Sequence, residues 1–403
     1  MGDAGAVSNS LGDLAKNPAN IAHIQDSQIG LDYSPFVWKS IDAQFQGLKP
    51  NKKTGFYPEL PSLISPDNTP ARIAKSSKNQ LFGFSIIAFP PVELSQFSRK
   101  VLIKDIPLFA FRQSDNVAAR IERLKLKGLL GLVAAYRFDR LTLGGNLQYN
   151  GASVGGKVQV QATGDELFRF EADTSTIALQ WGLRFEIIPK TLDFGFSGPI
   201  FEQNKAEVKV DTGLFAQSQK VGPPGPSPLT RFLTGIRYRM GPTSILFDLE
   251  YVKGSPEQGI ALDDFRVGMR DVHDTVSPRI GVRYLKRSDF ILLGGYHYQP
   301  ARYGDGDREQ NGLIGFGALD LMMIYLGLEA LTPYHLVGMG AEFKLWRRPQ
   351  TETPEKDGPE YPWTLSIGMT YRTASRGVGP SGTMPGAFTE NRLAIPIGIT
   401  YRY

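Results

Sequence analysis

The chain has no cysteine among its 403 residues, so disulfide frameworks and thiol chemistry are excluded and no redox compartment is indicated. It also lacks any run near the roughly 18–20 apolar residues that a membrane-spanning helix requires. The longest apolar stretches, Leu129–Tyr136 and Leu321–Leu328, have the length of strands. No secretion leader is visible at Met1-Gly2-Asp3, so an exported protein would have to be a mature chain. The net charge of +5 is spread along the sequence, which argues against a nucleic-acid-binding arm.

Catalytic and metal-binding patterns are also scarce. The 4 histidines lie far apart, with no His-x-x-His or Glu-x-x-His spacing. Gly151–Gly155 formally matches the nucleophile-elbow pattern, but that mechanism needs a strand–turn–helix element, and extended sequence flanks this match on both sides. Asp305–Glu309 has acids at alternate positions without the glycine of a calcium loop, which favours a surface turn. We therefore expect that the protein is not an enzyme and that it binds no metal and no cofactor.

What the sequence has in abundance is alternation, most clearly in its last stretch, Asn391–Tyr403. Leucine, isoleucine and tyrosine occupy one set of alternate positions there, and small or polar residues occupy the other. A period of two is that of a β-strand, whose successive side chains point to opposite sides. The apolar face meets either a second sheet in a soluble sandwich or lipid in a membrane barrel. One strand does not separate these two alternatives.

The remaining strands favour the barrel. From Leu126 onward, strands are joined alternately by two-residue turns, such as Asp139-Arg140 and Gly241-Pro242, and by long loops. Outer-membrane barrels show this asymmetry between short periplasmic turns and long outer loops. A membrane protein without helical spans can only be a closed barrel. We predict an all-β fold, a transmembrane antiparallel β-barrel of about 14 strands (roughly 12 to 16 allowed) over residues 26–403. The ambiguous stretches are 90–112 and 312–331.

Charged residues occupy the inward positions of these strands. The carboxylates among them are Glu186, Asp193, Asp248, Glu250, Asp289 and Glu342, and Lys344 and Arg402 share the same face. Mixed signs fit an internal ion-pair lattice that fills the lumen, or a basic path that attracts anionic ligands such as fatty carboxylates. The candidate lumen cations are Arg184, Arg231, Arg237, Arg239, Arg279, Arg283 and Arg372.

The N-terminal segment, residues 1–25, does not alternate. It begins with the small residues Gly2-Asp3-Ala4-Gly5-Ala6 and then reaches Asn17-Pro18-Ala19. This opening resembles that of the outer-membrane long-chain fatty-acid transporter superfamily (FadL/TodX-like, including the PorV-type barrels of type IX secretion). The resemblance implies that residues 1–25 form a periplasmic hatch, a small plug inside a barrel of 14 strands, with Asn17, Pro18 and Ala19 as its motif.

The region before the regular strands contains an apolar segment, Val101–Phe111. We predict an amphipathic helix after it over Asp115–Leu126, because Val117, Ile121 and Leu124 share a helical face. The apolar segment and the helix together resemble the outer loop of this family, which forms an apolar ligand-binding groove. The alternative is ordinary loop packing. The candidate ligand-binding side chains are Phe109, Phe111, Ile121 and Leu124.

The resemblance implies a multi-pass protein of a Gram-negative outer membrane that transports hydrophobic molecules passively, long-chain fatty acids being an example. The expected partners are membrane lipid, a hydrophobic small-molecule ligand and the barrel-assembly machinery, and no nucleic acid. The terminal aromatic residues Tyr401 and Tyr403 resemble the assembly signal of such barrels. The alternative is a PorV-like barrel that docks secreted or surface proteins at its outer face.

Overall fold

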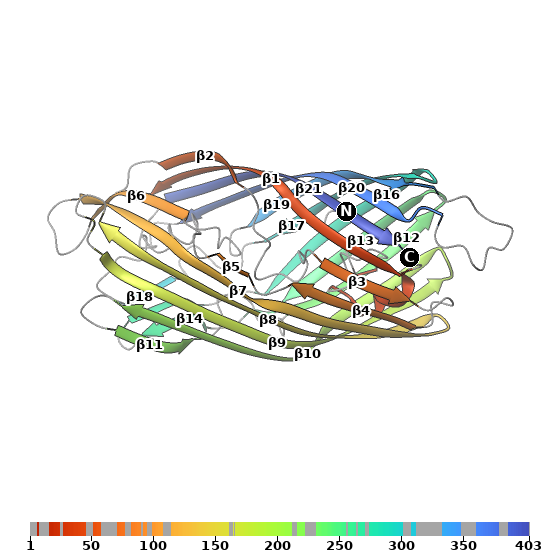
Figure 1. Ribbon diagram of the computed structural model, residues 1–403, viewed down its shortest axis with the longest axis horizontal. Helices are drawn as coiled ribbons and strands as arrows, with labels where there is room; N and C mark the ends of the chain where they lie inside the picture. The colour runs from red at the N-terminus through yellow and green to blue at the C-terminus, as the bar shows by residue number, and fades with distance from the viewer. Residues whose placement is uncertain are drawn as a thin grey trace.

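The part of the chain that the structure describes is almost entirely β-structure (Figure 1). The computed structural model describes residues 6–7, 16–24, 27–45, 51–57, 71–76, 82–89, 92–94, 99–107, 114–160, 164, 166–211, 216–221, 231–254, 257–262, 265–270, 274–300, 308–311, 333–347, 360–378 and 386–402. One short 3-10 helix, η2 (Pro18–His23), precedes the strands. Within these residues no helix has the length and apolar character to cross a bilayer.

The strands and their bounds are β1 (Gln28–Phe45), β2 (Asn51–Tyr57), β3 (Ala71–Ser76), β4 (Phe82–Phe89), β5 (Val92–Leu94), β6 (Arg99–Pro107), β7 (Ser114–Phe138), β8 (Leu141–Val160), β9 (Glu166–Ile188), β10 (Leu192–Asp211), β11 (Ala216–Val221), β12 (Arg231–Met240), β13 (Thr243–Val252), β14 (Glu257–Leu262), β15 (Phe265–Arg270), β16 (Thr275–Arg287), β17 (Phe290–Gln299), β18 (Arg308–Asn311), β19 (Tyr334–Leu345), β20 (Trp363–Val378) and β21 (Gly386–Arg402). Strands β14, β15 and β18 form a separate 3-stranded sheet.

The main sheet is antiparallel, and its pairings return to their starting strand. β1 pairs with β3, β3 with β4 and β4 with β7. The order then runs through β8, β9, β10, β12, β13, β16, β17, β19 and β20 to β21, which pairs with β1. The wall has 14 strands, as predicted, while β2, β5, β6 and β11 pair beside it.

The two faces of the wall differ as alternation predicts. On β8, Leu143 and Leu147 are 44% and 47% exposed and point outward, whereas Thr142 and Asn146 are fully buried on the other face. The same alternation holds on β12, β13 and β16. The outer face is therefore apolar and the inner face polar.

The apolar outer face ends partway along the longest strands. On β9, which has 23 residues, the outward positions are apolar from Phe185 back to Ile177 and become polar from Ser175 to Arg169. Strands β12, β13 and β17, with 10 residues each, cover only the apolar span. At about 3.3 Å per residue, ten residues are the length of a tilted strand in a bilayer. The wall around β7–β10 thus extends beyond the apolar belt at the end away from the short turns.

Short turns join several strands at the right-hand end of Figure 1, near the C-terminus. Asp139, Lys190 and Gly241 adopt left-handed backbone angles in three of these turns, with φ values of 51°, 63° and 56°. The two-residue turns predicted at Asp139-Arg140 and Gly241-Pro242 are confirmed, whereas three residues, 189–191, separate β9 from β10.

The predicted amphipathic helix over Asp115–Leu126 is wrong, because this stretch lies inside β7, a strand of 25 residues. The pairing of β7 with β8 shifts register between Ile121 and Arg123. A bulge of this kind advances the alternation by one residue, so a strand with one bulge can imitate the helical spacing of Val117, Ile121 and Leu124. The apolar segment Val101–Phe111 overlaps β6, which begins at Arg99 and ends at Pro107.

The two stretches that were ambiguous in the sequence differ in outcome. The first, 90–112, contains β5 and β6. The second, 312–331, lies outside the described residues.

Candidate functional site

Residues 6–7 and 16–24 of the N-terminal segment lie against the inner face of the wall at the short-turn end. Asn17 is the N-cap of η2, and its Oδ1 accepts a hydrogen bond from the Ala19 backbone N–H at 3.1 Å. Its Nδ2 donates to the carbonyl oxygens of Ala6 at 2.7 Å and of Leu183, in β9, at 3.0 Å. Pro18 occupies the first helical position, where the missing N–H costs nothing. Only an amide side chain can accept from the helix and donate twice to carbonyls.

Glycines on the inner face give this segment room. A Cβ atom added at Gly144 in β8 would lie 2.6 Å from the backbone nitrogen of Ala19. One added at Gly83 in β4 would lie 2.6 Å from the carbonyl carbon of Ile21. The obstructing atoms are backbone, which cannot rotate aside, so both positions require glycine. Gly182 and Gly195 approach the segment similarly.

Polar contacts fix the segment on the other side as well. The backbone N–H of Ala6 donates to Oδ2 of Asp248, in β13, at 2.8 Å. The Ser197 hydroxyl, in β10, donates to the carbonyl of Lys16 at 2.6 Å. Ala6 and Val7 are fully buried and pack with Leu233 of β12. The segment is therefore attached to strands from β4 to β13.

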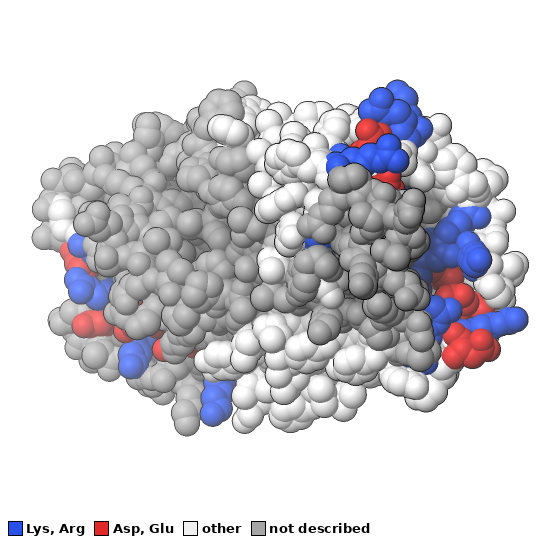
Figure 2. Space-filling view, turned by 45° about the vertical axis from the view of Figure 1, so that its right-hand side comes forward, with Lys and Arg blue, Asp and Glu red and all other residues white. Residues whose placement is uncertain are grey.

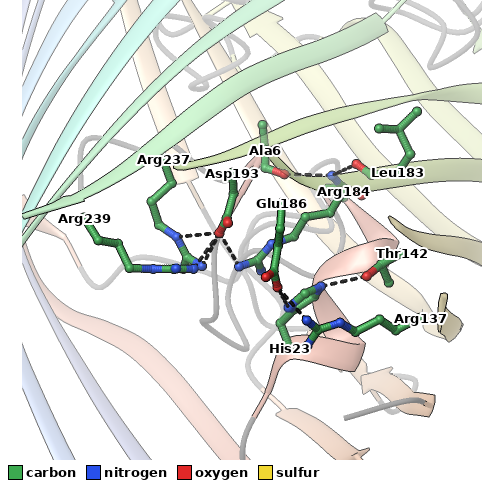
Figure 3. A network of polar contacts seen from close by, with 11 residues as sticks. Ala6, His23, Arg137, Thr142, Leu183, Arg184, Glu186, Asp193, Arg237 and Arg239 are labelled. Atoms are coloured by element: carbon green, nitrogen blue, oxygen red, sulfur yellow. Dashed lines mark hydrogen bonds and ion pairs between the residues drawn. The ribbon is translucent and has the colours of Figure 1, made fainter. Parts of the chain in front are cut away.

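His23, the last residue of η2, joins the segment to buried charges (Figure 3). Its Nε2 lies 2.8 Å from Oγ1 of Thr142. Its Nδ1 is 3.9 Å from Oε1 of Glu186, which also pairs with Arg137 at 2.9 Å. Burial, with added repulsion from Arg184, Arg137 and Arg239, lowers the pKa of His23 to about 2. The imidazole is therefore neutral at physiological pH.

Next to this contact, three arginines converge on one carboxylate oxygen. Oδ2 of Asp193 accepts from Arg184 at 2.7 Å, from Arg237 at 2.6 Å and from Arg239 at 2.5 Å (Figure 3). Arg184 and Asp193 are fully buried, whereas Arg239 is partly exposed. Buried charges are stable only when paired in this way. The cluster has more positive than negative charge.

The other predicted lumen cations are dispersed along the inner face. Arg279 pairs with Glu250 at 2.6 Å, and the Arg372 guanidinium lies over the Tyr334 ring, 4.3 Å from its centroid. Arg231 is exposed at the start of β12, and Arg283 is half-buried in β16. The structure thus brings together Arg184, Arg237 and Arg239, and leaves the remaining cations separate from that cluster.

The other predicted site residues fall into two groups. Ile121 and Leu124 lie in β7, while Phe109 and Phe111 lie outside the described residues. Tyr401 lies in β21, with its ring 4.8 Å from that of Trp363; Tyr403 lies outside the described residues.

Sequence reasoning did not identify the contacts of His23 or the inner glycines. Alternation places Gly144 and Gly182 inward, and inward glycines on adjacent strands were the available signal of a segment packed against the wall. A lone histidine gave no comparable signal. Within the described residues, no group of three or more histidine or acidic side chains could hold a metal ion.

An antiparallel 14-stranded wall, apolar outside and polar inside, is the fold of a membrane β-barrel. Several solved structures have a similar fold. A FadL homologue of Pseudomonas aeruginosa matches with a TM-score of 0.57 and 10% identity, covering 99% of this chain and 96% of that one. The toluene transporter TodX of P. putida matches with 0.56 and 10% identity, covering 98% and 95%.

A third match is TbuX, the toluene transporter of Ralstonia pickettii, with a TM-score of 0.52, 12% identity and coverage of 100% and 96%. At these identities the likeness establishes the fold, and it confirms the resemblance inferred from Asn17-Pro18-Ala19 at the level of fold. Scanning models of protein families and searching curated protein sequences gave no match.

Proposed function

We propose that the protein is a passive channel of a Gram-negative outer membrane that admits hydrophobic molecules, with residues 1–25 as a plug inside the barrel. The N-terminal segment supports this most strongly. Its described residues are buried against the inner face, yet the contacts that hold them are hydrogen bonds and one close packing surface rather than strand pairings. A segment attached in this way can shift while the wall stays folded.

The similarity in fold supports apolar small molecules as the transported class. Two of the similar solved structures are described as toluene transporters, and a third as a FadL homologue. By analogy with them, this barrel admits apolar small molecules rather than sugars or ions. Such an argument concerns the class of ligand, because a fold can host different functions.

The inner face favours cargo with an anionic headgroup, such as a long-chain fatty acid. Asp248, Arg279 and His297 are direct neighbours across β13, β16 and β17, and Arg372 and Arg392 are neighbours across β20 and β21. This succession contains three arginines and one carboxylate. Guanidinium groups bind carboxylates with two parallel hydrogen bonds, so a basic inner face attracts a fatty carboxylate. An ion-pair lattice that fills the lumen is the competing role for the same residues.

The outer capture site in this proposal is formed by Phe109, Phe111, Ile121 and Leu124. Their apolar character and their place in the sequence, ahead of the regular strands, support this role. Tyr401 and Tyr403 act as the terminal assembly signal and would direct the chain to the barrel-assembly machinery.

Uptake into liposomes tests the transport proposal. Protein reconstituted in liposomes should accelerate entry of a long-chain fatty acid, followed by an internal pH-sensitive dye. Replacing Phe109, Phe111, Ile121 and Leu124 by serine should slow uptake without loss of the folded barrel. Val276→Ser and Val337→Ser, outward positions of β16 and β19, serve as the matched control.

If neither the intact barrel nor its variants accelerates uptake, the transport proposal is wrong. The docking role then becomes the better account. The polar outer surface of β9 beyond the apolar belt, from Ser175 to Arg169, would offer a protein partner a surface outside the bilayer.

A further inference from the structure

Three exposed cations stand at the short-turn end, just beyond the apolar belt. Each lies two residues after an exposed apolar side chain at or near the end of a strand. The pairs are Phe138 with Arg140, Ile188 with Lys190, and Tyr284 with Lys286. At the edge of a membrane-embedded surface, this is the level of the lipid headgroups.

These cations lack ion pairs in the described part of the chain, unlike their neighbours. Arg287 pairs with Asp289 at 3.2 Å, and Arg347 pairs with Glu360 at 2.8 Å. Figure 2 shows blue basic surface gathered at the right-hand end of the molecule, with red acidic surface between its parts. After the pairs are set aside, positive charge remains at this rim.

Lys190 occupies its turn at a conformational cost. Its φ of 63° is in the left-handed region, which glycine and asparagine adopt more easily than lysine. The Lys190 side chain is exposed and forms no ion pair among the described residues that would compensate this cost.

Lys286 stands beside a surface suited to an acyl chain. Its ammonium nitrogen is 6.0 Å from the centroid of the Phe290 ring, which packs 5.0 Å from Phe343. Trp346, 69% exposed, and Trp363 continue this aromatic surface, with ring centroids 5.9 Å apart. A cation beside exposed aromatic rings fits an amphiphile with an anionic head and an apolar tail.

We propose that Arg140, Lys190 and Lys286 bind the phosphate groups of anionic phospholipids, of the phosphatidylglycerol kind, in the leaflet at the short-turn end. This inference rests on the proposed function for the orientation of the barrel, because short turns face the periplasm in outer-membrane barrels. A zwitterionic lipid carries its own cation and gains less from these side chains. Each basic residue near a lipid surface contributes enough to change affinity for anionic lipid about fivefold.

Native mass spectrometry of the full chain, released from mixed micelles containing equal phosphatidylglycerol and phosphatidylcholine, tests this proposal. The wild type should retain phosphatidylglycerol preferentially. The combined variant Arg140→Gln, Lys190→Gln and Lys286→Gln should lose this preference, with about a fivefold fall for each cation removed. The control carries Arg169→Gln, Lys205→Gln and Lys209→Gln, exposed cations on β9 and β10 beyond the belt, and should keep the preference.

Equal retention of both lipids by the wild type would overturn the proposal, as would equal losses in the two variants. Heat-modifiable mobility in gels verifies that each variant is folded. Liposome uptake is measured separately, so a failed lipid preference leaves the transport proposal standing, and failed uptake leaves the lipid result interpretable.

Discussion

Arg184 and Asp193 face each other across β9 and β10, with Nη2 and Oδ2 2.7 Å apart and neither side chain accessible to solvent. Two further arginines share the same carboxylate, and the N-terminal segment lies next to the cluster. The carboxylate therefore supports both the wall and the surface against which the segment packs.

Replacing that carboxylate should destabilise the barrel. Asp193→Asn removes the buried carboxylate charge on which Arg184, Arg237 and Arg239 converge, so we expect a loss of about 3–5 kcal/mol in the free energy of unfolding. Urea unfolding in lipid vesicles, followed by heat-modifiable gel mobility, measures this loss. Asp211→Asn, on the exposed end of β10, is the control and should change stability little. Similar stabilities for the two variants would contradict the assigned role of Asp193.

Docking of the N-terminal segment should weaken in acid because of His23. The pKa of His23 is lowered to about 2 when the segment is docked, and an undocked imidazole titrates near its ordinary value of 6.5. Docking stability is therefore complete above pH 6.5 and falls as the pH drops below it, by at most about 1.4 kcal/mol per pH unit.

Cysteine labelling measures this effect, since the chain has no cysteine of its own. The side chain introduced by Ala22→Cys is fully buried and should react with a maleimide only when the segment leaves. Labelling should be faster at pH 5 than at pH 7.5, after correction for thiol ionisation with a free peptide. Adding His23→Gln should abolish the difference; a difference that persists would assign the pH response to other groups.

Two adjacent glycines of β8 provide a matched pair for the docking surface. Gly144→Ala places a methyl group against the backbone of Ala19, whereas a Cβ at Gly145 meets only the Gln180 carbonyl oxygen, at 3.9 Å. Gly144→Ala should therefore speed Ala22→Cys labelling at pH 7.5, and Gly145→Ala should not. Both variants should remain folded by gel mobility. Equal labelling in the two variants would show that the segment does not rest on β8.

The apolar belt makes a prediction about sidedness. Leu147→Arg places a charge in the middle of the outer apolar face of β8, which should cost about 2–4 kcal/mol in a bilayer. Ser175→Arg, at the first polar outward position of β9, should cost less. Folding titrations in lipid vesicles compare the two variants. Equal costs would contradict the membrane assignment of the outer face.

Much of the wall could be predicted from the sequence because alternation and turn residues are local signals. Strands β12 and β13 meet at the predicted turn Gly241-Pro242, because glycine and proline mark a turn in the sequence. The prediction of a helix around Ile121 was wrong because a bulge changes the period of β7. Local spacing of apolar residues does not distinguish a bulged strand from a helix.

The candidate site was predictable only in part. Asn17 and the inward arginines follow from a motif and from alternation, but the convergence of Arg184, Arg237 and Arg239 on Asp193 depends on the register between β9, β10 and β12. The contact of His23 with Thr142 joins residues 119 positions apart and has no local signature.

Conductance across a planar bilayer tests most directly the claim that the N-terminal segment plugs the barrel. The intact protein should conduct little, while a chain lacking residues 1–25 should be folded by gel mobility and should show a steady open-channel current. Asn17→Ala, which removes the donor to the Ala6 and Leu183 carbonyls, should produce intermittent openings. A current that is the same in the intact and truncated proteins would contradict the account.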